Sequence, residues 1–201
     1  MKSAIITVTS EGSGFNEALM MTEALGTERG LARKSLLHLR LLSEELFGLL
    51  RGIAGKVEAS YWLEVEEKRF ELHMKSDVKL TTEMRDQFLA ASSSGKNEAS
   101  KSFMGKIRVM IANVLLSAKE ALPYALINTA AAYPMGGMAG ESASVWSMAF
   151  YKEEIQKHIK DSAEASEAWD ELEKSIVANI ADDVKVKIAG KNVEITVCKA
   201  F

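Results

Sequence analysis

The stretch SLLHLRLLSEELFGLLRGIAG, residues 35–55, is the most regular helical pattern in the chain. Its apolar residues recur at intervals of three and four, which places them along one side of an α-helix: Leu39, Leu42, Leu46, Leu49, Leu50 and Ile53. The pattern predicts a long helix over residues 28–53. Glu44 and Gly48 lie four residues apart on a neighbouring face. A carboxylate beside a glycine gap, on so apolar a helix, indicates either the remains of a ligand site or a helix edge that faces water.

Composition excludes several classes of protein. The chain has 201 residues, of which 47% are hydrophobic and 26% are charged, as expected for one globular domain. A net charge of −3 provides no broad basic surface, so a nucleic-acid partner is not expected. One cysteine, Cys198, excludes an internal disulfide and fits a cytoplasmic protein. The sequence has neither a secretory signal nor a run of about 18 apolar residues, so no membrane association is expected.

Alternation of apolar and polar residues predicts five strands. A turn at Glu67-Lys68 joins the second and third into a hairpin, and a turn at 189–192 joins the last two. In each hairpin one face is apolar and the other is polar, which is typical of a sheet that helices cover on one side only. The predicted strands are residues 3–9, 61–66, 70–75, 184–188 and 193–197.

Helical spacing accounts for most of the remaining chain. We predict a two-layer α+β sandwich, a single domain over residues 1–201 with a mixed sheet of about five strands covered on one face by helices. Residues 120–181, before the closing hairpin, are predicted to be mostly helical, with a glycine-rich loop at 134–140. The other predicted helices span residues 15–25, 81–91, 99–121, 124–132, 142–160 and 163–181.

This order of elements resembles the histidine-kinase-type ATPase (GHKL) fold, and most of all its anti-sigma-factor serine kinases. Residues 42–52, LSEELFGLLRG, resemble the first nucleotide box of that family. The family has there a glutamate that activates a hydroxyl and, four residues later, an asparagine that holds magnesium. Glu44 matches the glutamate, whereas Gly48 stands at the asparagine position and has no side chain to offer a metal.

Two further boxes of the family are partly matched. The resemblance implies that Asp77, after the first hairpin, corresponds to the aspartate that reads adenine, although no glycine follows it here. Gly105 corresponds to one member of the glycine pair at which backbone amides meet phosphates. The resemblance covers about residues 1–118 and 183–201 and implies ATP or ADP as the ligand, if any is bound. Residues 120–181 have no counterpart in the family, so the resemblance implies that they are a helical insertion before the closing hairpin.

Each candidate also has a structural interpretation. Glu44 is also interpreted as an exposed helix residue paired with Arg40 or Arg51, and this interpretation is favoured. For Asp77, a turn or cap residue before the predicted helix at 81 is favoured over adenine recognition.

No metal site and no nucleophile is predicted. The three histidines each lack a second ligand three or four residues away: His38, His73 and His158. Cys198 lies on the polar side of the last strand, with no histidine near it in the sequence, so a nucleophilic role lacks support.

These observations favour a regulatory protein that is non-catalytic, or binds nucleotide only weakly, and acts through contacts with a protein partner. Two alternatives stay open at this point. One is an active ATP-dependent serine kinase that uses Glu44 and Asp77. The other is a small-molecule-binding protein with a pocket near the apolar, glycine-rich residues 120–140. A homodimer is also left open.

Overall fold

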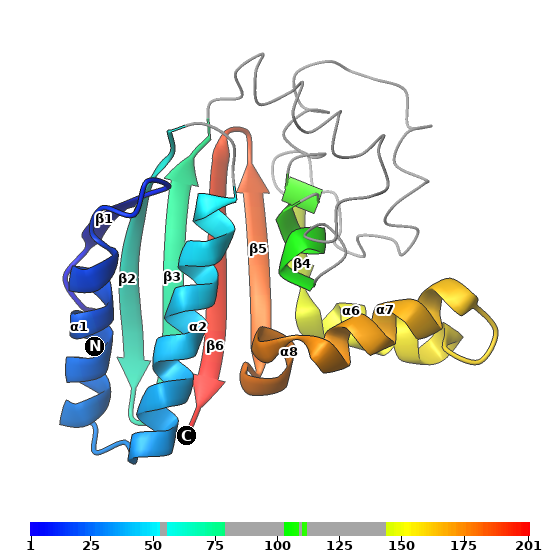
Figure 1. Cartoon of the computed structure of the whole chain (residues 1–201), viewed down its shortest axis with the longest axis horizontal. Coiled ribbons are helices and arrows are strands. Elements are labelled where there is room, and N and C mark those ends of the chain that lie inside the picture. Colours follow the sequence, from blue (N-terminus) through cyan, green and yellow to red (C-terminus); the bar gives the residue numbers. More distant parts are fainter. Residues whose placement is uncertain (53–55, 79–102, 109, 112–143) are drawn as a thin grey trace.

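The computed structural model describes residues 1–52, 56–78, 103–108, 110–111 and 144–201. They form the predicted α+β sandwich, with one open sheet and with helices α1 and α2 lying side by side on one of its faces (Figure 1). The strands are β1 (Ile6–Thr9), β2 (Glu58–Glu66), β3 (Arg69–Asp77), β4 (Ser144–Ser147), β5 (Asp183–Ala189) and β6 (Asn192–Ala200). The helices are α1 (Phe15–Glu28), α2 (Arg33–Arg51), α6 (Met148–His158), α7 (Ala163–Lys174) and α8 (Ile176–Ile180).

The sheet differs from the prediction in strand number and direction. Its order is β1-β2-β3-β6-β5-β4, and every pairing among the described strands is antiparallel, so the prediction of a mixed sheet is wrong. Both predicted hairpins are confirmed. Each turns through two residues, with a positive φ at Glu67 (51°) and at Gly190 (60°), as tight hairpin turns require.

The sixth strand, β4, lies inside the predicted helix 142–160 and pairs with β5. Four residues are too few to show an alternation that could compete with the helical pattern that follows them. The Ser147 hydroxyl accepts a hydrogen bond from the Phe150 amide at 3.2 Å. This cap makes Met148 the first residue of α6.

Two predicted helix boundaries also move. The second helix begins at Arg33 rather than at residue 28, because α1 continues to Glu28 and Gly30 (φ 68°) then turns the chain. The predicted helix 163–181 is two helices. Ser175 has an extended backbone (φ −81°, ψ 125°), and its side chain accepts a hydrogen bond from Ala178 at 3.2 Å, which caps α8.

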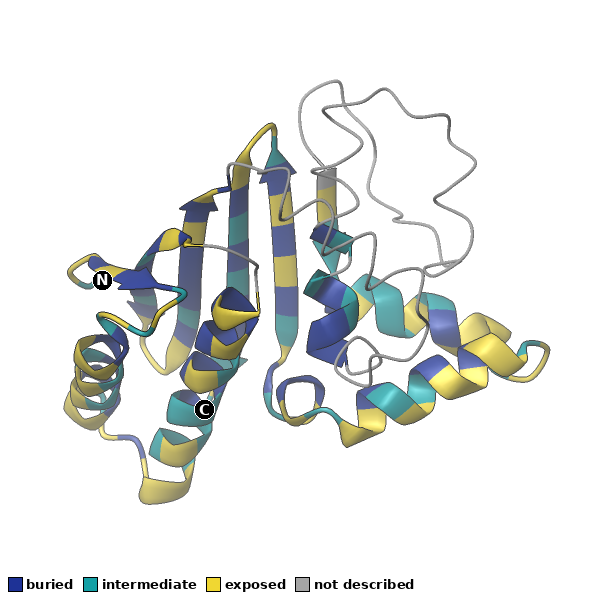
Figure 2. Cartoon of the chain, turned by 45° about the horizontal axis from the view of Figure 1, so that its top comes forward, coloured by how far each residue is buried: buried dark blue, intermediate teal, exposed yellow. Residues whose placement is uncertain are grey.

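The core lies between the sheet and the helices. Side chains on the covered face are buried, and in the strands they alternate with more exposed ones (Figure 2). The ring of Phe47 stacks on Phe15 at 4.4 Å and meets Tyr61 edge-on at 5.1 Å. The Tyr61 hydroxyl lies 2.9 Å from the hydroxyls of both Thr22 and Ser43, and burial raises the pKa of Tyr61 to about 12.

Several predictions fall outside the described residues: the helices 81–91 and 124–132, the loop 134–140 and the pocket near 120–140. Within the predicted helix 99–121, the described residues 103–108 and 110–111 are helical. In the part of the chain that the structure describes, no helix is long and apolar enough to cross a membrane.

Candidate functional site

The first predicted site lies on α2. Glu44 is exposed, and its carboxylate accepts a hydrogen bond of 2.9 Å from Nε of Arg40 one turn earlier. Arg40 also contacts Glu23 of α1 at 2.6 Å. Glu44 is therefore an exposed helix residue paired with Arg40, one of its two predicted interpretations. Because Arg40 also contacts Glu23, these ion pairs link α2 to α1 at the surface.

Gly48 is exposed one turn beyond Glu44. Among the residues that the structure describes, a Cβ added to Gly48 would have no atom within 4 Å apart from its own helix and chain neighbours. With respect to the described residues, the space beside Gly48 is therefore open, and a side chain could enter it without a clash with them.

The other two predicted residues lie on different elements. Asp77 is exposed at the end of β3, opposite Asn192 of β6. Gly105 is buried in the helical residues 103–108. These helical residues pack beside the end of α2. The Arg108 guanidinium lies so close to Gly52 that a Cβ at this position would overlap it.

A cavity of about 200 Å³ lies on the helical side of the molecule. Glu45, Phe103 and Met104 line it together with residues of α7 and α8. Burial, and secondarily the charge of Glu44, raise the pKa of Glu45. Glu45 and Glu171 of α7 thus both line this cavity, whereas the carboxylate of Glu44 points to its ion pair with Arg40.

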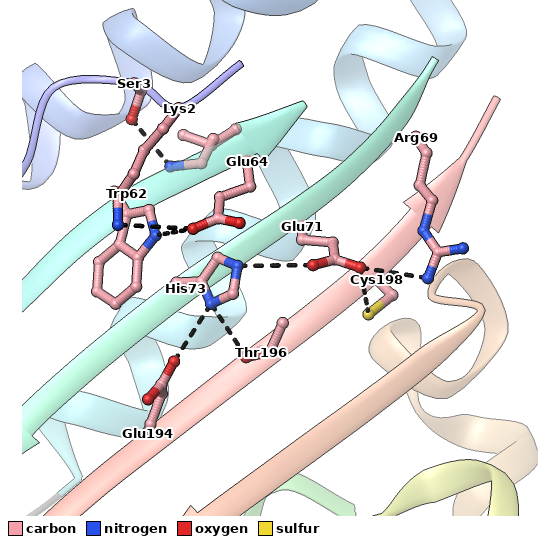
Figure 3. A network of polar contacts seen from close by, with 11 residues as sticks. Lys2, Ser3, Trp62, Glu64, Arg69, Glu71, His73, Glu194, Thr196 and Cys198 are labelled. Carbon is pink, nitrogen blue, oxygen red and sulfur yellow. Dashed lines mark hydrogen bonds and ion pairs between the residues drawn. The ribbon is translucent and has the colours of Figure 1, made fainter. Parts of the chain in front are cut away.

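A second cluster of polar side chains occupies the opposite face of the sheet, on β2, β3 and β6 (Figure 3). The tight turn at Glu67 sets the register of β2 against β3, so Glu64 faces Glu71 and Trp62 faces His73. Strand β6 completes the cluster from the other side of β3. It places Thr196 opposite His73 and Cys198 opposite Glu71.

His73 is at the centre of this cluster and is only 8% exposed. The indole of Trp62 stacks on its ring, with centroids 4.8 Å apart and planes 3° from parallel. The Nδ1 atom of His73 lies 3.2 Å from the Thr196 hydroxyl and 3.5 Å from Oε1 of Glu194. The Nε2 atom is buried and makes no hydrogen bond to any described residue, and it points toward Glu71, whose Oε2 lies 3.8 Å away (Figure 3).

The two glutamates beside His73 have other partners. Glu71 accepts a hydrogen bond of 3.2 Å from Nη2 of Arg69. Glu64 accepts one of 3.1 Å from the Trp62 indole N–H, and Nζ of Lys2 lies 3.5 Å away. The indole hydrogen bond lowers the pKa of Glu64, and the charge of Lys2 acts in the same direction, so this carboxyl is ionised at neutral pH.

Cys198 is buried on the same face, with Sγ 3.9 Å from Oε1 of Glu71. Burial, followed by the negative charge of Glu71, raises the pKa of its thiol. A protonated thiol is a poor nucleophile and a poor metal ligand. Cys198 therefore contributes to the packing of the cluster.

The cluster was missed by an interpretation that searched for ligands only at helical spacing. On a strand, Glu71 and His73 share a face because they are two residues apart. The hairpin turn then places Glu64 opposite Glu71. The period of two and the predicted turn at Glu67-Lys68 were the signals that could have found it.

Comparison of the chain with protein-family models, with curated proteins and with solved structures finds no match. The function is therefore inferred from the fold, from the surroundings of Glu44 and Gly48 on α2, and from the polar cluster on β2, β3 and β6.

Proposed function

We propose that this chain is a regulatory protein built on a degenerate ATPase scaffold, and that it acts by protein contact rather than by phosphoryl transfer. The observation that carries the proposal is Gly48, which leaves open space where the anti-sigma-factor kinases have their metal-binding asparagine. Phosphoryl transfer depends on a metal ion and on backbone groups that position the phosphates. A helix that offers no side chain at this position cannot supply that metal ligand.

The surroundings of Glu44 support the same proposal. In a catalytic arrangement this carboxylate would accept a proton from a hydroxyl, and it would have to be free to approach that hydroxyl. Here it accepts a hydrogen bond from Arg40, which is itself anchored to Glu23. A surface ion pair of this kind is weak, but it turns the carboxylate toward α1.

The main experiment is a titration of the full chain with ATP and ADP, with and without Mg²⁺, followed by measurement of phosphate release. We expect no magnesium-dependent phosphate release, and nucleotide binding that is absent or insensitive to Mg²⁺. Release that depends on Mg²⁺ and disappears in Glu44→Ala, with the fold intact, would favour the serine-kinase alternative.

A matched pair of variants tests the ancestry of the site. Gly48→Asn returns the family's ligand, and Gly48→Ala introduces the same change in backbone freedom without it. Both should fold, because the position is open. A degenerate ATPase scaffold predicts a magnesium-dependent gain in ADP affinity for Gly48→Asn alone. Equal behaviour of the two variants would mean that this part of α2 did not evolve from a metal site.

A further inference from the structure

We propose that Glu64, Glu71 and His73 form a binding site for a divalent transition-metal ion of the Zn²⁺ class, on the face of the sheet that α1 and α2 leave uncovered. This site is separate from the nucleotide boxes and does not depend on the function proposed above. It combines an imidazole nitrogen with two carboxylates, a set of donors that suits Zn²⁺ better than Mg²⁺ or Ca²⁺.

The three donors already converge. One ligand atom from each of Glu64, Glu71 and His73 lies within 4.8 Å of the other two. Ligands held about 2.1 Å from a tetrahedral ion are roughly 3.4 Å apart, so only a small contraction is needed. The two carboxylates can supply it, because the side chains of Glu64 and Glu71 are 46% and 29% exposed and can rotate.

Contacts at the Nδ1 side of its ring orient His73 for this role. Its Nδ1 atom lies against Thr196 and Glu194, at 3.2 and 3.5 Å. A hydrogen bond from Nδ1–H to such an acceptor leaves the lone pair on Nε2, which is how metal-binding histidines are usually held. Nε2 is buried and has no hydrogen bond within the described part of the chain, and an unsatisfied buried nitrogen is costly. A bound ion would satisfy it.

Trp62 fixes the remaining geometry. Its ring lies parallel to the imidazole and restricts the rotation of His73, while its indole N–H holds the carboxylate of Glu64. Lys2 and Arg69 lie beside the two glutamates, but their side chains are 52% and 58% exposed and can move into solvent when an ion arrives. Three protein ligands leave a fourth position for water.

The test is calorimetric titration of the full chain with ZnCl₂, and separately with MgCl₂ and CaCl₂. We expect one Zn²⁺ per chain, with binding of Mg²⁺ and Ca²⁺ weaker by at least about tenfold. His73→Gln and Glu71→Gln should each weaken Zn²⁺ binding by about tenfold or more. His158→Gln removes an exposed histidine at the end of α6 and should leave the affinity unchanged.

Glu194→Gln tests the orienting role, because this residue approaches His73 but is not among the proposed ligands. We expect roughly a tenfold loss of Zn²⁺ affinity, in the range that such supporting residues usually contribute. Zn²⁺ should also raise the melting temperature of the parent chain and not that of Glu71→Gln.

Two results would overturn the proposal. One is a parent chain that shows no saturable Zn²⁺ binding. The other is binding that is equally strong in the parent, His73→Gln and Glu71→Gln, which would place the ion elsewhere. Glu71→Gln keeps the shape of a partly exposed side chain, so it should fold even if the buried His73 position does not tolerate glutamine.

Discussion

The two faces of the six-stranded sheet are buried by different means. On the covered face, Tyr61 and Leu63 of β2 are fully buried within the apolar core beneath the helices. On the other face, Trp62 and His73 are each 8% exposed because they cover one another, with Lys2 lying over the indole at 4.6 Å. Within the described residues, the same strands therefore carry one face packed by helices and one face covered by its own aromatic and polar side chains.

From this difference we expect the covered face to contribute most of the stability and the other face to bind ligands. A close-packed apolar layer is sensitive to the loss of any methyl group, because its neighbours cannot fill the gap. A self-covered polar layer can relax and admit water, so it tolerates change and can accommodate a ligand. Substitutions on the two faces, and one on the outer surface of α2, should therefore differ in their cost.

Leu63→Ala should destabilise the fold by roughly 2–5 kcal/mol, as expected for a leucine truncated in a closed core. Leu63 is fully buried and pairs with Leu72 across β2 and β3. Urea unfolding of the parent and the variant measures the difference. A loss below about 1 kcal/mol would mean that the helices do not close this face as tightly as the structure shows.

Alkaline pH should weaken the covered face through Tyr61. The folded state keeps the phenolic proton up to a pKa of about 12, whereas the ordinary value is 10.0. Between these values the unfolded state binds fewer protons, so stability that is complete below pH 10.0 is lost as the pH rises toward about 12. The shift in the pKa of Tyr61 corresponds to a loss of roughly 3 kcal/mol in the free energy of unfolding.

Tyr61→Phe is the control for this pH dependence. It should abolish the alkaline loss that Tyr61 causes and cost only about 1 kcal/mol at neutral pH. The cost is small because Thr22 and Ser43 keep their hydrogen bonds to the carbonyls of Ala18 and Leu39. Unfolding curves at neutral pH and between pH 10.0 and about 12 compare the two proteins. Identical alkaline slopes would show that Tyr61 is not the group responsible.

Trp62→Ala should cost less than Leu63→Ala, about 1–2 kcal/mol, although more side chain is removed. The substitution removes the stacking of Trp62 on His73. Because water can replace the indole on this open face, no sealed cavity remains. Urea unfolding of the two variants under the same conditions shows which face of the sheet contributes more to the free energy of unfolding. A larger loss for Trp62→Ala would contradict the comparison.

Glu44→Gln should change the unfolding free energy by no more than about 0.5 kcal/mol, because its ion pair with Arg40 is exposed. The matched change at Glu71, on the sheet, serves as the reference. Thermal melts at low and high salt measure both. A large, salt-sensitive loss at Glu44 would indicate that the bridge to α1 supports the helical layer more than surface pairs usually do.

Much of the fold could be read from the sequence, because its signals are local. The stripe from Leu39 to Leu50 predicted α2, and the alternation after Val184 predicted β5 and β6 with their buried faces. Strand β4 and the break at Ser175 could not be read in the same way. The first depends on pairing with β5, and the second on a single cap inside an otherwise continuous helical pattern.

The candidate sites divide in the same manner. The sequence was sufficient to show that Gly48 offers no metal ligand and that Arg40 could pair with Glu44, because these relations lie within one helix. It did not show that His73 meets Thr196 and Glu194, since these residues are more than a hundred positions apart along the chain.

The sequence by itself thus determined which side of each main helix and strand is apolar, since periods of 3.6 and 2 are properties of the local backbone. Tertiary structure alone decided the order β1-β2-β3-β6-β5-β4 and the contacts made across β3. Pairing of β3 with β2 and β6 brings two glutamates to one histidine, and that pairing is selected by burial of the opposite, apolar face. The polar cluster is therefore a consequence of how the covered face packs.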